Sequence, residues 1–137
     1  LSLHDALPIC GVAPVRALSA RLRVPTEHRD LGLLVCEHHL VMHRFHELKP
    51  STVMRLLERL DGLRRPERVR RFALACEADH RGRLGLSDRP YPQGNRLLDA
   101  LAAARSVGAQ KLLDSGLSGI ALGEALQRER VAAIAAI

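Results

Sequence analysis

Apolar residues in this chain recur at intervals of three and four positions, and nowhere do they alternate with polar ones over the length of a strand. That spacing places them along one face of an α-helix, whereas a half-buried strand requires alternation. Aromatic residues make up only 2% of the 137 residues, so leucine, alanine, valine and isoleucine must build the core. The pattern predicts an all-α fold.

We expect about seven helices, divided by prolines and glycines. Pro14 and Pro66 each suit the first turn of a helix, where the amide hydrogen that proline lacks has no partner. The segment Gly85–Gly94 contains too many turn residues to be helical. The expected helices are Ala13–Leu22, Glu27–His43, Thr52–Leu60, Glu67–Arg83, Asn95–Ser106, Ala109–Ser115 and Ile120–Ile137. The expected inward faces include Val15, Leu18 and Leu22, then Val53, Leu56, Leu57 and Leu60, then Val69, Phe72, Ala73 and Cys76.

The first ten residues, LSLHDALPIC, do not continue this pattern. They resemble a translated sequencing adapter, so we expect residues 1–10 to be non-native and foreign to the fold. The His4-Asp5 pair within them is the dyad of metal-dependent phosphohydrolases, but Pro8 would interrupt a helix that carried it. We expect residues 11–84 to form the helical body and residues 85–137 a smaller helical tail.

The chain is strongly basic, with a formal net charge of +6 and 19 arginines among its 21 basic residues. Such a charge favours polyanionic partners, because phosphate contacts release condensed counterions. A solvated basic surface without a partner is the alternative.

The densest basic segment lies before and along the beginning of the fourth expected helix. Its members are Arg64, Arg65, Arg68, Arg70 and Arg71, with Glu67 the one acidic residue among them. The planar guanidinium donates two hydrogen bonds at once, which suits phosphate. A second candidate is the pair Gly116 and Gly119, since a glycine turn that leads into a helix exposes amide groups to an anion. An ordinary corner between two helices would give the same pattern.

Histidine and aspartate offer a separate candidate, a metal site. His39 and His43 are four residues apart and share a helical face, but no carboxylate lies between them as in helical metal motifs. Asp79 follows apolar neighbours and needs a partner if it is buried. Because Arg81 and Arg83 are expected on other faces, that partner would come from another helix or be a metal. An interhelical ion pair is the simpler interpretation.

Several classes of protein are disfavoured. Three cysteines without a CxxC motif do not form a disulfide framework or a zinc knuckle. No run of about 18 apolar residues would span a membrane. The beginning lacks the charged region of a signal peptide. We therefore expect a cytoplasmic protein.

Five segments together resemble one family. They are RLRVPTEHRDLGLLVCEHH (21–39), LKPSTVMRLLERLDGLRRPERV (48–69), ACEADHRGR (75–83), RPYPQG (89–94) and GLSGIALGEALQRERVAAI (116–134). In order and spacing they are similar to the bacterial CCA-adding enzymes, the class II tRNA nucleotidyltransferases of the multifunctional type. The resemblance covers about nine tenths of the chain.

The resemblance implies a parent enzyme that adds CCA to the 3′ end of tRNA from CTP and ATP, with Mg²⁺ bound in its head. This chain has none of the head or neck motifs, so it would be a C-terminal fragment, the body and tail that hold tRNA. We expect no catalytic residue and no cofactor in the fragment, and no nucleotidyl transfer by it alone. Arg64, Arg65, Arg68, Arg71, Gly116 and Gly119 are the expected RNA contacts.

Multifunctional members of this family also carry an HD phosphohydrolase domain with a divalent metal. By position, His39 resembles its late histidine and Asp79 its closing aspartate, which implies an incomplete half-site. One alternative function is therefore the remnant of a phosphohydrolase acting on 2′,3′-cyclic nucleotides. A second is a helical interaction domain without a nucleic-acid role.

Overall fold

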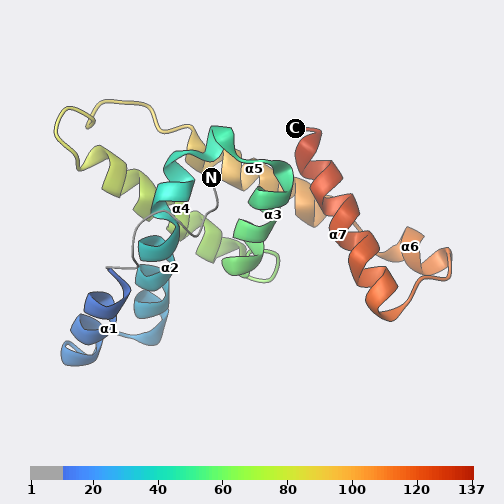
Figure 1. Ribbon diagram of the computed structural model, residues 1–137, viewed down its shortest axis with the longest axis horizontal. Helices are drawn as coiled ribbons and strands as arrows, with labels where there is room; N and C mark the ends of the chain where they lie inside the picture. Colours follow the sequence, from blue (N-terminus) through green and yellow to red (C-terminus); the bar gives the residue numbers. More distant parts are fainter. Residues whose placement is uncertain (1–10) are drawn as a thin grey trace.

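The computed structural model describes residues 11–137, and the adapter-like segment with His4-Asp5 lies outside the described residues. Residues 11–137 contain helices and no strand, which confirms the all-α prediction. The elements are α1 Val12–Arg21, α2 Thr26–His43, the 3-10 turn η1 Phe45–Glu47, α3 Pro50–Arg59, α4 Pro66–Arg81, α5 Gln93–Ser106, α6 Gln110–Asp114 and α7 Gly119–Ala135. Figure 1 shows α1 and α6 at opposite ends of an elongated molecule, with α3, α4 and α5 between them.

The seven described α-helices lie close to their expected ranges, and the differences have local causes. Helix α3 begins at Pro50 instead of Thr52, since proline is well suited to a first helical position. Helix α4 ends two residues early, at Arg81. The short turn η1 was not expected. It places Phe45 in the core, 9% exposed, directly after α2.

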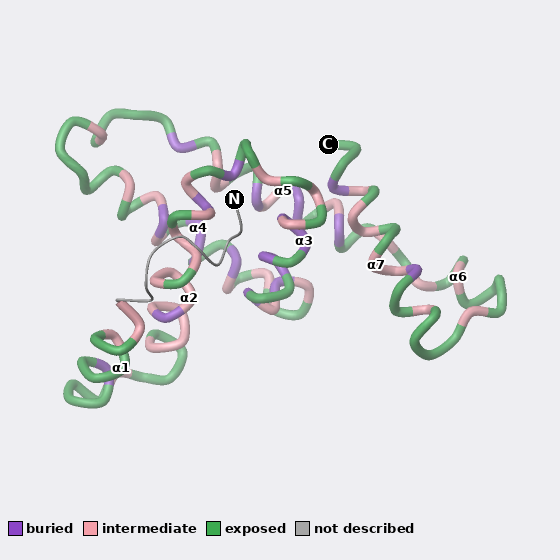
Figure 2. The backbone as a smooth tube through the Cα atoms, in the orientation of Figure 1, coloured by how far each residue is buried: buried purple, intermediate pink, exposed green. Residues whose placement is uncertain are grey.

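The core lies where α3, α4 and α5 meet. Phe72, Met54 and Leu57 have no exposed surface, and Leu97 of α5 closes the same cluster. Figure 2 shows that these helices contain many of the buried residues, while most residues of α1 and of the turns around α6 are exposed. The apolar inward faces expected for the third and fourth helices are confirmed, whereas Asp79, which follows them, is 42% exposed. The core takes residues from both sides of position 84, and the division into 11–84 and 85–137 stays a prediction.

The first helix departs from expectation. Leu18 is 47% exposed and Leu22 61% exposed, so the prediction that they face inward is wrong. Helix α1 packs chiefly against α2, and the buried residue in it is Ser19. Within the stripe of α1, Val15 lies against α2 and is half-buried, whereas Leu18 and Leu22 extend beyond that contact.

A close approach of backbone to side chain defines the connection from α3 to α4. Asp61 takes a left-handed conformation with φ of 54°, and the amide of Gly62 then donates to the carbonyl of Leu57 at 2.8 Å. A Cβ atom at Gly62 would lie 2.7 Å from Cγ2 of Val69. The missing side chain therefore lets Val69 of α4 pack directly against the turn that follows α3. In the described part of the chain, no helix is long and apolar enough to cross a bilayer.

Candidate functional site

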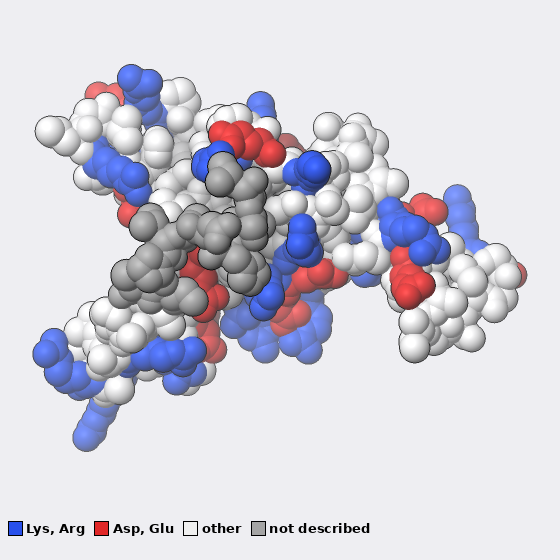
Figure 3. Space-filling model, in the orientation of Figure 1, with Lys and Arg blue, Asp and Glu red and all other residues white. Residues whose placement is uncertain are grey.

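The expected arginine stripe lies on the connection between α3 and α4 and on the first two turns of α4. Figure 3 shows basic side chains gathered near that connection, with acidic side chains beside them. Arg64 is held by Asp61 at 2.6 Å, and Arg65 lies 3.4 Å from the same carboxylate. The hydrogen bond from Arg64 lowers the pKa of Asp61 below its ordinary value, so this carboxylate is ionised at neutral pH.

Two further arginines of the stripe have acidic partners. Arg70 lies 3.3 Å from Glu67, and Arg71 pairs with Glu27 at the beginning of α2. Arg68 makes no ion pair with any residue that the structure describes. Five guanidinium groups against three carboxylates leave the stripe with a net charge of +2. Its ion pairs are exposed, and exposed pairs contribute at most about 1 kcal/mol each.

The two glycines expected to face RNA lie in the turn between α6 and α7. Gly116 and Gly119 have φ values of 88° and 55°, in the left-handed region that glycine adopts more readily than other residues. Both are exposed, and space around them is open. Helix α7 begins at Gly119 without a side-chain cap. Its first amide groups are therefore open to solvent.

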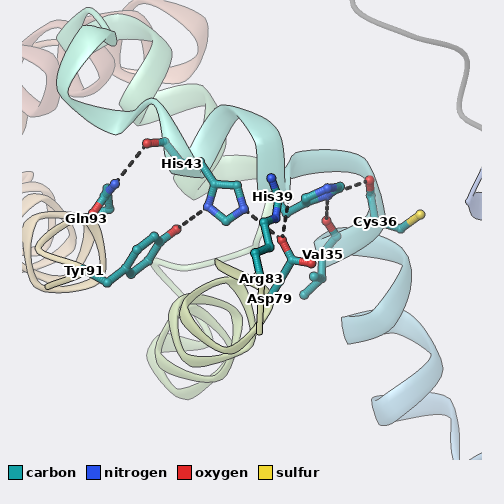
Figure 4. A network of polar contacts seen from close by, with 8 residues as sticks. All are labelled: Val35, Cys36, His39, His43, Asp79, Arg83, Tyr91 and Gln93. Carbon is teal, nitrogen blue, oxygen red and sulfur yellow. Dashed lines mark hydrogen bonds and ion pairs between the residues drawn. The ribbon is translucent and has the colours of Figure 1, made fainter. Parts of the chain in front are cut away.

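A hydrogen-bonded network that the sequence did not indicate joins α2, α4 and the loop before α5 (Figure 4). Nε2 of His43 lies 2.9 Å from Oδ2 of Asp79, and Nδ1 of His43 lies 2.9 Å from the hydroxyl of Tyr91. The guanidinium of Arg83 donates to the same carboxylate oxygen at 3.2 Å. The side-chain amide of Gln93 donates to the carbonyl of His43 at 3.0 Å. Each of these hydrogen bonds joins two residues that lie at least four positions apart in the sequence.

The protonation states in this network follow from burial and charge. Burial lowers the pKa of His43 below its ordinary value, and the bond to Asp79 offsets only part of that change. Burial alone would raise the pKa of Asp79, but His43 and Arg83 together bring it below its ordinary value. A neutral His43 that donates from Nε2 to an ionised Asp79 satisfies both shifts. Its Nδ1 then accepts from Tyr91, whose pKa burial raises.

Asp79 has a partner on another helix, but the contact with the neutral ring of His43 is a hydrogen bond and not the ion pair of the simpler interpretation. The expectation that Arg83 points elsewhere is wrong, because its side chain returns one turn along the chain to Asp79. His39 is not hydrogen-bonded to Asp79. Nδ1 of His39 instead donates to the carbonyl of Val35 at 2.9 Å, which leaves Nε2 as its open ring atom.

The residues of the expected half-site do not complete a metal centre among residues 11–137. No group of three His, Cys, Asp or Glu side chains there is arranged to hold a metal ion. His39 and Asp79 alone fall short of the three protein ligands that catalytic zinc sites use. The assignment of these two residues as a half-site stays a prediction.

His43 and Tyr91 were the residues that sequence reasoning missed. His43 was visible as the partner of His39 at helical spacing, and Tyr91 is the third residue of the RPYPQG motif. Spacing could not show which of the two histidines meets Asp79. The ring of His80 lies beside both residues: its centre is 5.3 Å from that of His43 and 5.1 Å from that of Tyr91.

The fold and the site define an all-helical, arginine-rich chain whose described residues assemble no metal centre. Comparison with known proteins then shows which family it matches. The chain is 56% identical over 126 residues to a multifunctional CCA protein of Stenotrophomonas maltophilia (strain R551-3), covering 92% of this chain and 31% of that protein. It is 51% identical over 125 residues to one of Xanthomonas campestris pv. campestris (strain B100), covering 91% of this chain and 30% of that protein.

A third relative, the multifunctional CCA protein of Alkalilimnicola ehrlichii, is 50% identical over 134 residues, which is 98% of this chain and 32% of that protein. The chain is therefore a homologue of one segment of the multifunctional CCA proteins, and the predicted family resemblance is confirmed. It spans about a third of the length of these relatives. No protein-family model matches the chain, and no solved structure matches it.

Proposed function

We propose that this chain is the tRNA-binding body and tail portion of a CCA-adding enzyme. The parent would add CCA to the tRNA 3′ end from CTP and ATP with Mg²⁺ in its head, and would work in the cytoplasm. The chain itself would hold the stacked acceptor and TΨC arm and perform no nucleotidyl transfer. The observation that carries the proposal is the exposed arginine stripe, in a homologue of proteins named for CCA.

In this proposal the stripe contacts the RNA backbone by charge and not by base readout. Arg68 is available to a phosphate without breaking an ion pair among the described residues. Arg64, Arg65 and Arg71 would exchange a carboxylate for a phosphate, and exposed ion pairs are weak enough for that exchange to cost little. The open amide groups at Gly116 and Gly119 would add a contact of the same kind.

Substitution of Arg68 by glutamine tests the proposal. The matched control is Arg105→Gln, which removes the same charge from an exposed position near the end of α5. We expect Arg68→Gln to weaken tRNA binding about 3- to 10-fold and to reduce the salt slope by about one, while Arg105→Gln changes little. Equal losses of affinity in the two variants would show that the arginine stripe does not contact the tRNA. A wild-type chain without affinity for tRNA would reject the function itself.

The second candidate is the phosphohydrolase remnant. The observation that favours it is the gathering of the rings of His39 and His80 beside His43, which is itself bonded to Asp79. Its assay is metal content after purification, together with hydrolysis of 2′,3′-cyclic nucleotides by the wild type and by His39→Ala. Activity that needs a divalent metal and is lost in the variant would support this candidate. Metal-free, inactive wild-type protein would reject it.

A further inference from the structure

A small pocket lies between η1 and the beginning of α5, away from the arginine stripe. Its volume is about 240 Å³, and its lining consists of His46, Pro90, Pro92, Gln93 and Arg96. This is smaller than the roughly 300–1,000 Å³ of sites that enclose a whole small molecule. The lining contains two residues that can carry positive charge and no acidic residue.

The walls of this pocket are fixed by the chain. Pro90 and Pro92 have restricted backbone torsions. The amide of Gln93 is held by the carbonyl of His43, as Figure 4 shows. Tyr91, between the two prolines, is buried and bonded to the ring of His43. The pocket is therefore formed before any ligand enters, which reduces the ordering cost of binding.

The charge at the pocket is available to an anion. Arg96 is exposed and makes no ion pair with the residues that the structure describes. The side chain of His46 is 62% exposed, and its nearest carboxylate is that of Glu47, at 3.6 Å. Glu47 is already engaged by Arg44, whose hydrogen bond lowers its pKa. In addition, α5 begins here without a side-chain cap, so its first amide groups add positive potential.

We propose that this pocket binds one backbone phosphate of an RNA strand, with Arg96 and His46 as its two hydrogen-bond donors. The assignment rests on the proposed function and extends it to a second phosphate contact outside the stripe. A free phosphate ion has the same chemistry, but it would fill only part of the space. A sugar attached to the phosphate would lie against the two prolines.

The test uses a fluorescein-labelled RNA hairpin that copies the acceptor and TΨC arm, measured by anisotropy with the full chain. The variants are Arg96→Gln and His46→Gln, both at exposed positions, and the control is Arg105→Gln on the same helix. We expect Arg96→Gln to weaken binding about 3- to 10-fold with a salt slope reduced by about one. We expect a smaller loss for His46→Gln and less than about a 1.5-fold change for the control.

The double variant tests whether both side chains act on one phosphate. Removing both should then cost less than the product of the two single losses, because contacts to a shared group are not independent. Independent losses would contradict a shared phosphate. Inorganic phosphate titrated to about 10 mM at constant ionic strength should leave the difference between wild type and Arg96→Gln intact. If it abolishes that difference, free phosphate competes with the RNA for the pocket, which would contradict a preference for a phosphate that carries a sugar.

The result also separates this proposal from the proposed function. If the wild type binds the hairpin and Arg96→Gln equals Arg105→Gln, the pocket plays no part and only this inference fails. If the wild type does not bind RNA at all, the proposed function fails first.

Discussion

At the scale of single residues, His43 is the most informative side chain in the molecule. Both of its ring nitrogens and its carbonyl have partners, and these come from α4, α5 and the loop between them. A neutral ring meets all of these contacts at once, which agrees with the lowered pKa of His43. The network thus fixes the loop before α5 and, with it, the walls of the phosphate pocket.

Tyr91→Phe tests this network with the loss of one oxygen atom. The substitution keeps the buried ring and leaves Nδ1 of His43 without its donor. We expect a loss of about 1–2 kcal/mol in the free energy of unfolding, the usual cost of a broken hydrogen bond with an unsatisfied buried partner. Denaturant unfolding followed by circular dichroism measures it. Stability equal to wild type would show that the hydroxyl contributes nothing.

The histidines also predict how stability depends on pH in metal-free protein. Burial lowers the pKa of His38 and of His43 below the ordinary value of 6.5, so the unfolded chain binds protons more readily than the folded one. Their contribution to stability is therefore complete above pH 6.5 and is lost as the pH falls below it. We expect a lower melting temperature at pH 5.5 than at pH 7.5. The difference should shrink in His38→Gln, and an unchanged difference in that variant would exclude His38 as a cause.

At the scale of elements, the sequence predicted each helix because apolar spacing and proline placement are local properties. Pro66 and the stripe from Val69 to Cys76 define α4 without reference to the rest of the chain. Whether a residue is buried depends instead on elements that are distant in the sequence. Leu18 and Leu22 form a good stripe on α1 yet remain exposed, because no described element covers them. The pairing of His43 with Asp79 was hidden for the same reason, since 36 residues separate the partners.

Two glycine substitutions with opposite expected signs compare the crowded turn between α3 and α4 with an open position in α7. Gly62→Ala would place a methyl group 2.7 Å from Val69 and 3.2 Å from the carbonyl of Leu57, and should destabilise the fold by about 1–3 kcal/mol. Gly123→Ala adds the same methyl group inside α7, where the space is open, and should stabilise by about 0.5–1 kcal/mol. Thermal unfolding of both variants gives the comparison. A stabilised Gly62→Ala would contradict the close contact between Gly62 and Val69.

At the scale of the whole molecule, the core lies at the centre and the functional surface is charged. Helices α3, α4 and α5 bury the large side chains, and the arginine stripe lies where α3 joins α4. The composition alone gave the basic excess of +6. It could not show which arginines have acidic partners, because Asp61, Glu67 and Glu27 contact them only in the folded chain. The structure thereby singles out Arg68 within a stripe that the sequence could only outline.

The most direct test of the central claim is the affinity of the wild-type chain for tRNA over a series of salt concentrations, beside a DNA duplex of similar length. Each phosphate contact contributes about −0.7 to −0.9 to the slope of log affinity against log salt. With two to four such contacts from the stripe and the pocket, we predict a slope of about −1.4 to −3.6 and tighter binding to tRNA than to DNA. A slope near zero, or equal affinity for the two nucleic acids, would contradict the account.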